Sequence, residues 1–224
     1  MQVYLKTEPN RLSESFQEAL YQHTGGHALF VIELQREMKE RGGLRRGEGG
    51  LWEESEAIDW QTFPAKFDGV IERRIGHLDE DLQSLLTVAS VEGESSTAEV
   101  VARVQALNER NLVRRLSREL DNQHRLVTAQ ALERLGAQRL SLYRFRHQLF
   151  QQYLYTNLDD MERTYLHKEV GLVIETLYAD QSEQVAVQLA RHFEEAGIAE
   201  KAVAYSHRQK RARIMVGARK AVCS

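Results

Sequence analysis

Residues 125–146 read RLVTAQALERLGAQRLSLYRFR, and this stretch decides the class of fold. Over residues 140–145 the side chains alternate in character as a half-buried strand requires, and residues 126–129 fit a partner strand. A turn around Gly136 would join the two. Ala129, Leu132 and Leu135 also fit a helix, so periodicity alone leaves both alternatives open. We predict a two-stranded hairpin here.

Outside this stretch the sequence favours helix. It has only two prolines, Pro9 and Pro64, and proline is the main helix breaker. Apolar residues recur at helical spacing, with charged residues on the opposite side. We predict helices over residues 11–23, 28–41, 64–77, 97–106 (after a capping box of Ser96 and Glu99), 109–121, 146–157, 159–178, 183–196 and 199–214, and one that follows a cap at Asp79.

Composition excludes several classes of protein. The 224 residues are 42% apolar and 28% charged, which is typical of a chain that folds. The net charge of −3 gives no bulk electrostatic reason for tight binding to nucleic acid or to an anionic membrane. No run approaches the roughly 18 apolar residues of a membrane span. The single cysteine, Cys223, excludes an internal disulfide. We expect a cytoplasmic protein with no membrane partner.

The motifs of catalysis are missing. A phosphate loop needs Gly-x-x-x-x-Gly-Lys-Ser/Thr, and the glycines of residues 42–50 lack the Lys-Ser/Thr pair, so they indicate a flexible linker. His23 and His27 have the spacing of two metal ligands on a helix, but two glycines separate them, which favours surface histidines. We therefore expect no enzymatic activity, no cofactor and no metal site in this chain.

Arg114, Arg115 and Arg118 lie on the predicted helix just before the hairpin. A helix followed by a hairpin is the winged form of the helix-turn-helix, whose second helix can enter the DNA major groove. The alternative is a solvated basic face that nearby acidic residues partly balance, and we favour this alternative because the net charge is not basic.

Several segments resemble one family of proteins. Residues 24–34, Thr-Gly-Gly-His-Ala-Leu-Phe-Val-Ile-Glu-Leu, resemble a string in the helical lid of STAND-class signalling ATPases, relatives of the AAA+ ATPases. The resemblance continues in the family's order to about residue 206. Residues 64–78 are similar to the helix after the lid, 85–94 to the start of the winged helix, 143–155 and 163–167 to the helices beyond the wing, and 189–197 and 200–205 to the first tetratricopeptide-like repeats.

The resemblance implies a mainly α fold in four parts. We expect a lid remnant over residues 1–45, a Gly-rich linker over 46–62 and a winged-helix-like domain with one hairpin over 63–155. The start of a helical repeat array, with an atypical tail, would fill residues 156–224. In such proteins an ATPase core binds ATP and Mg²⁺, the winged helix acts as a hinge, and the repeats sense a ligand or partner.

The resemblance also assigns a nucleotide-lid remnant to Gly25, Gly26, His27 and Ala28. Ala28 stands where the family has a proline that approaches the adenine, and His27 stands where it has asparagine. Since proline fixes φ and removes a donor, we do not expect the usual adenine contact. The phosphate loop and the Mg²⁺ carboxylates are also missing, so the ATPase core would lie outside this chain.

We expect a non-catalytic regulatory fragment of a STAND-type ATPase, which relays conformational change between a nucleotide module and a sensor array. Its partner would be a protein or the missing ATPase module. The first alternative is a winged-helix transcription regulator that binds DNA through Arg114, Arg115 and Arg118. The second is a cryptic ATPase that a partner chain completes.

Overall fold

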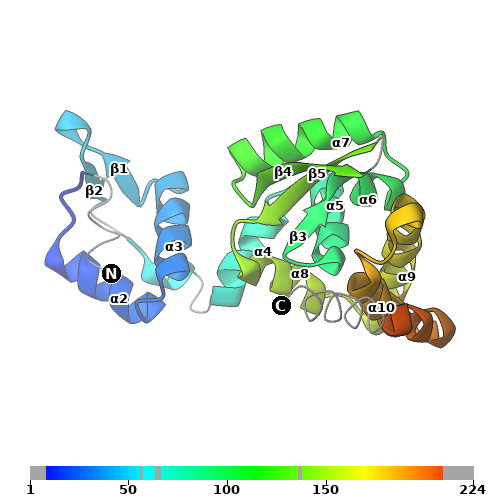
Figure 1. Ribbon diagram of the computed structural model, residues 1–224. Coiled ribbons are helices and arrows are strands. Elements are labelled where there is room, and N and C mark those ends of the chain that lie inside the picture. Colours follow the sequence, from blue (N-terminus) through cyan, green and yellow to red (C-terminus); the bar gives the residue numbers. More distant parts are fainter. Residues whose placement is uncertain (1–8, 56–57, 64–66, 136–137, 209–224) are drawn as a thin grey trace, which may run out of the picture. The chain divides into compact units, whose positions relative to one another are not determined.

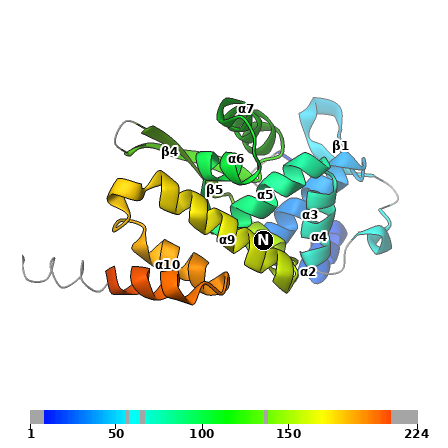
Figure 2. The ribbon, with the colours of Figure 1, turned by 90° about the vertical axis from the view of Figure 1, so that its right-hand side faces the viewer.

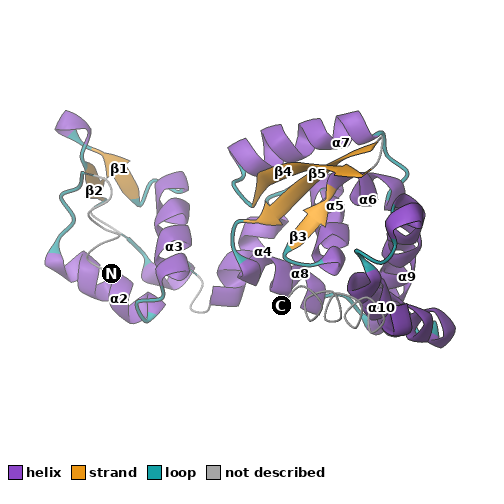
Figure 3. Ribbon diagram, in the orientation of Figure 1, coloured by secondary structure: helices purple, strands orange, loops and turns teal. Residues whose placement is uncertain are grey.

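The computed structural model describes residues 9–55, 58–63, 67–135 and 138–208, and its elements are mainly helices (Figures 1 and 3). This confirms the predicted mainly α class. The chain divides into two compact units, residues 1–78 and 79–224. We describe each unit by itself.

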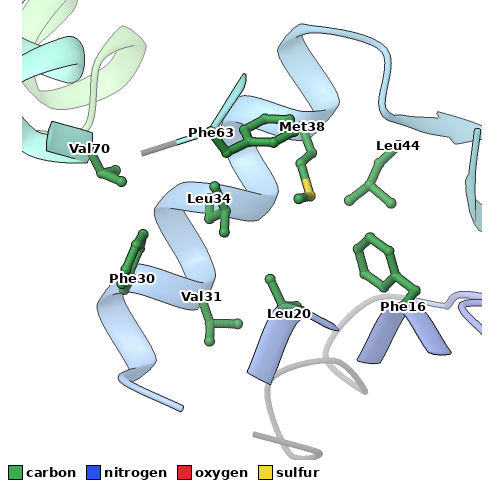
Figure 4. Close-up of a cluster of buried hydrophobic side chains, with 9 residues drawn as sticks. All are labelled: Phe16, Leu20, Phe30, Val31, Leu34, Met38, Leu44, Phe63 and Val70. Atoms are coloured by element: carbon green, nitrogen blue, oxygen red, sulfur yellow. The ribbon is translucent and has the colours of Figure 1, made fainter. Parts of the chain in front are cut away.

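The first unit is a set of helices with one small hairpin. Its elements are α2 (Glu14–Thr24), α3 (Ala28–Glu40), β1 (Leu44–Arg46), η1 (Glu48–Gly50), β2 (Trp52–Glu54), η2 (Trp60–Thr62) and α4 (Phe67–Gly76). Pro64, the predicted start of the last helix, lies outside the described residues. Phe16, Leu20, Leu34 and Met38 form the core of the unit with five more buried side chains (Figure 4).

The glycine-rich stretch of this unit is not the flexible linker that the sequence predicts. β1 and β2 pair antiparallel from Leu44 opposite Glu54 to Arg46 opposite Trp52. Gly49 and Gly50 have φ of 84° and 76°, which suits the turn between the strands. Leu44 is buried in the core and Trp52 packs against it, so apolar anchors at both ends hold the segment in place.

The second unit begins with a three-stranded sheet and the helices around it. The elements run α5 (Glu80–Glu92), β3 (Ser95–Thr97), α6 (Ala98–Val104), α7 (Glu109–Arg115), the π-helical η3 (Leu116–Gln123), β4 (Val127–Leu135) and β5 (Gln138–Phe145). The strands lie in the order β3-β5-β4, and both pairings are antiparallel. The predicted hairpin over 125–146 is therefore confirmed, although its turn at Gly136 lies outside the described residues.

One predicted start signal in this unit is wrong. Ser96 belongs to β3, opposite Tyr143, and does not cap a helix with Glu99. The Glu99 carboxylate instead accepts a 2.8 Å hydrogen bond from the backbone N–H of Ser141 in β5. Strand pairing competes with helix capping for the same polar groups, and here the pairing prevails. The cap predicted at Asp79 is confirmed, because its carboxylate accepts from the N–H of Leu82.

Four more helical segments complete the second unit. They are α8 (Gln148–Thr156), α9 (Asp160–Leu177), α10 (Ala186–Glu195) and residues 199–208, with the short η4 (Ala179–Gln181) before α10. Figure 2 shows α9 and α10 side by side, and α9 also packs on α5 and α6. The helices beyond the hairpin therefore share one compact unit with it.

Polar contacts lock these C-terminal helices to α5. The Arg191 guanidinium of α10 donates to the carbonyl of Val91 at 2.9 Å, and the Gln151 amide of α8 donates to the carbonyl of Ser90 at 2.8 Å.

A buried carboxylate joins the end of α5 to β3. The Glu92 carboxylate accepts from both the N–H and the hydroxyl of Thr97. Burial raises the pKa of Glu92 to about 7.

A buried histidine pair joins α9 to α10. His167 and His192 are both 0% exposed, and their Nδ1 atoms lie 2.9 Å apart. Because one Nδ1 must donate and the other accept, the hydrogen bond requires that at least one Nδ1 carry no proton. The Tyr155 hydroxyl of α8 contacts His167 Nε2 at 3.0 Å. Burial, with help from the nearby Arg191, lowers the pKa of His167 to about 4 and that of His192 to about 3.

We expect this pair to make the second unit less stable in acid. Its stabilisation is complete above the unfolded-state pKa of about 6.5 and is lost as the pH falls towards the folded-state values. The unfolded chain takes up protons that the native pair excludes. Each histidine should then lower the free energy of unfolding by about 1.4 kcal/mol per pH unit. Urea denaturation between pH of about 7 and about 5 measures this slope.

Glu92 also contributes to the pH dependence of the free energy of unfolding, with the opposite sign. Its raised pKa adds stability as the pH falls through about 7, so the variants must separate its effect from that of the histidines. His192→Leu should weaken the acid-dependent loss relative to the wild type, since Glu92 contributes equally to both proteins. His207→Gln, at an exposed position, is the matched control and should keep the wild-type slope. Equal slopes for His192→Leu and the wild type would contradict the prediction.

Candidate nucleic-acid interface

α7 and η3 carry a buried leucine stripe and an exposed polar face. The Asn108 side chain caps α7 by accepting from the N–H of Asn111 at 3.2 Å. Leu112, Leu116 and Leu120 recur every four residues and are at most 3% exposed. Their burial fixes the rotation of the helix about its axis, so the opposite face is presented to solvent.

Only two of the three arginines predicted for this helix lie on that face. Arg114 and Arg118 are exposed. Arg115 is turned towards the start of α5, where its guanidinium pairs with Asp79 at 3.1 Å and with Asp81 at 3.2 Å. It also pairs with Glu119. Arg115 is therefore engaged in ion pairs within the unit, unlike Arg114 and Arg118.

Arg110 takes the place of Arg115 on the exposed face. Arg110 and Arg114 are one helical turn apart, and both line a shallow depression with Arg118. Asn111, Val113 and Ser117 line the rest of it. The spacing of residues 110, 114 and 118 is the signal that could have found Arg110 from the sequence.

The hairpin adds a second group of arginines on the same side of the sheet. Arg134 of β4 lies directly opposite Arg139 of β5. Alternate residues of a strand share a face, so Arg139 lies on the same face as Tyr143. The Tyr143 hydroxyl contacts the Ser117 hydroxyl at 2.7 Å, which shows that this face is the one that α7 and η3 cover. Both groups of arginines therefore belong to one side of the unit.

We call Arg110, Arg114, Arg118, Arg134 and Arg139 the arginine face. None of the five takes part in an ion pair or a side-chain hydrogen bond within the part of the chain that the structure describes. Neighbouring arginines differ in this respect. Arg144 pairs with Glu94, and Arg146 pairs with Asp121 at 2.5 Å. Three of the four acidic residues of 109–146, namely Glu109, Glu119 and Asp121, pair with arginines outside this face.

The arginines of the arginine face repel one another, and the fold keeps them close despite this repulsion. Residues 109–146 contain nine arginines and four acidic residues, although the whole chain has a net charge of −3. Like charges one helical turn apart destabilise a helix by about 0.2–0.5 kcal/mol per pair, and like charges directly opposite in a hairpin are also unfavourable. An anion that lies on this face would relieve the repulsion.

A second charged cluster, between α3 and α4, is compensated. Glu37 pairs with Arg41 at 3.2 Å and also with Arg73, and Arg74 pairs with Glu33 at 3.3 Å. Glu33, Glu37, Arg73 and Arg74 line a small pocket of the first unit. Opposite charges already meet there, so this cluster stabilises the packing of two helices and offers no surplus charge to a ligand.

The predicted nucleotide-lid remnant, residues 25–28, spans the turn between α2 and α3 and the first residue of α3. Gly25 ends α2 with φ of 58°, and Gly26 has φ of 71° with the Tyr21 ring against it. His27 is the cap residue of α3, which starts at Ala28. The two glycines thus have a conformational reason to be here that needs no nucleotide.

Over the described ranges, no group of three or more His, Cys, Asp or Glu side chains is placed to hold a metal ion. Likewise, none of the helices within those ranges is long and apolar enough to cross a membrane. When the chain is compared with known proteins, no family model, curated protein or solved structure matches it.

Proposed function

We propose that this chain is a non-catalytic regulatory module whose second unit binds nucleic acid through the arginine face. The observation that carries the proposal is that five exposed arginines without acidic partners gather on one side of α7 and the hairpin. The order helix, strand, helix, helix, hairpin supports a winged helix-turn-helix interpretation of residues 79–146, with α7 as the second helix of that motif.

Nucleic acid suits this face for an electrostatic reason. A duplex carries a row of phosphates, and each one that an arginine neutralises releases a condensed counterion into solution. Arginine also presents a planar fork of donors that matches the phosphate oxygens. The free energy that the protein spends on repulsion between its arginines is then recovered on binding. A loss of affinity with rising salt concentration is the direct sign of this mechanism.

We expect Arg114→Glu to have opposite effects on stability and on binding. It replaces repulsion with Arg110 and Arg118 by attraction, so the free energy of unfolding should rise by about 0.5 kcal/mol. The affinity for a short labelled duplex should fall by about tenfold or more, with a shallower dependence on salt concentration. Urea denaturation and fluorescence anisotropy over a series of salt concentrations give the two quantities.

Lys168→Glu is the matched control, since it makes the same change in net charge at an exposed position of α9. It should leave the duplex affinity within about twofold of the wild type, because the arginine face is intact. If both variants lose affinity equally, net charge alone governs the interaction. If the wild type shows no salt-dependent binding, the proposed function is wrong.

The absence of catalysis is a separate part of the proposal. The sequence contains no phosphate-loop string, and Ala28 stands where the similar lids have proline. We expect calorimetry with MgATP to show no magnesium-dependent binding in the micromolar range. A micromolar, magnesium-dependent isotherm would instead favour the cryptic ATPase.

A relay between a nucleotide module and a sensor, as the resemblance to STAND-class ATPases implies, is the second candidate function. The joint between α5 and the C-terminal helices favours it. Arg191 and Gln151 hold helices beyond the hairpin to α5, and Phe150 is buried in α8, which packs on α5. A displacement of α10 would therefore move α5 as well, which a relay requires.

We expect Phe150→Ala to lower the free energy of unfolding by about 3–5 kcal/mol, because the ring is buried where α8 packs on α5. Amide hydrogen exchange should accelerate in both α5 and α10. Arg118→Ala is the surface control and should change stability by less than about 0.5 kcal/mol. Faster exchange that is confined to α8 would mean that the joint does not couple the helices, and the relay would fail.

A further inference from the structure

The polar residues between the arginines point to the kind of nucleic acid and to the way in which it is read. Asn111 and Ser117 lie in the same depression as Arg110, Arg114 and Arg118. Phosphate binding alone needs cations, whereas arginine, asparagine and serine together are the side chains that read base edges. Arginine pairs bidentately with guanine O6 and N7, and asparagine with adenine N6 and N7.

The shape of the site favours a duplex over a single strand. Single strands bind on exposed aromatic side chains, on which the bases stack. Residues 109–146 contain just two Phe, Trp or Tyr residues, Tyr143 and Phe145, and these are only 3% and 2% exposed. Neither ring is available for stacking, so this face offers electrostatic and hydrogen-bonding contacts without a stacking platform.

Among duplexes, the site fits DNA. The polar set lies on the exposed face of a helix, and the B-DNA major groove is wide enough to admit a helix. The major groove of duplex RNA is deep and narrow, and side chains cannot read it. Arg134 and Arg139 belong to a hairpin on the same side of the unit, where they can contact the phosphates beside the groove.

Resting on the proposed function, we infer that the exposed face of α7 reads the major groove of duplex DNA, with Arg114 as the central base-reading residue and Asn111 beside it. Arg114 lies about one helical turn from Arg110 on one side and from Ser117 on the other. It therefore occupies the middle of the polar set. The site prefers sequences in which a guanine meets Arg114 and an adenine meets Asn111, while the hairpin arginines contribute affinity without sequence preference.

The test begins with the wild-type chain and a randomised pool of DNA duplexes. Several rounds of selection, followed by sequencing, should enrich a short motif that contains guanine. The enriched duplex should bind at least about tenfold more tightly than its separated strand or an RNA duplex of the same sequence. Salt-dependent binding without an enriched motif, or equal affinity for the single strand, would overturn this inference and leave the proposed function standing.

Arg114→Lys separates base reading from charge. Lysine keeps the positive charge but loses the planar fork, so the affinity for unrelated duplexes should stay within about threefold of the wild type. The preference for the selected motif should fall by about tenfold, which corresponds to the loss of one bidentate contact. Arg139→Lys is the matched control on the hairpin and should keep the preference. If Arg114→Lys keeps the full preference, Arg114 does not read a base.

Discussion

The pairing of β5 between β3 and β4 is the constraint on which the second unit depends. β5 pairs on one edge with a strand about fifty positions earlier, where Ser95 lies opposite Arg144, and on the other edge with its hairpin partner, where Val127 lies opposite Phe145. It also presents Tyr143 to η3 on one face. Without this pairing, neither the orientation of α7 nor the position of the hairpin arginines would be defined.

The sequence predicts the parts of this arrangement that depend on local pattern. The hairpin follows from alternation around β5, and the cap at Asp79 follows from residue type and helical spacing. The missed strands have another cause. β3 is three residues long and carries no hydrophobic alternation of its own, so only its partner defines it. β1 and β2 lie among glycines and charges, and two apolar anchors outweigh that composition.

The sequence predicted where the candidate site lies, but not which arginines form it. Helical spacing places Arg114 and Arg118 close to one another, yet it cannot say which side of the helix meets acidic residues. Arg115 is turned away from the exposed face because it pairs with Asp79, which is 36 residues away in the sequence. The net charge of −3 is similarly uninformative, since it averages a basic stretch with acidic helices. Function of this kind depends on the local distribution of charge and not on its sum.

The number of residues in the π-helical segment η3 determines how the residues after it are rotated about the helix axis relative to α7. A π turn holds more residues than an α turn, so each residue of η3 turns the chain by less than a residue of α7 does. Each residue of an α-helix accounts for about 100° of rotation. Loss of a single residue from η3 would therefore rotate whatever follows the deletion by about that angle relative to α7. An insertion or deletion at this point would therefore change which residues face the solvent without any substitution elsewhere in the chain.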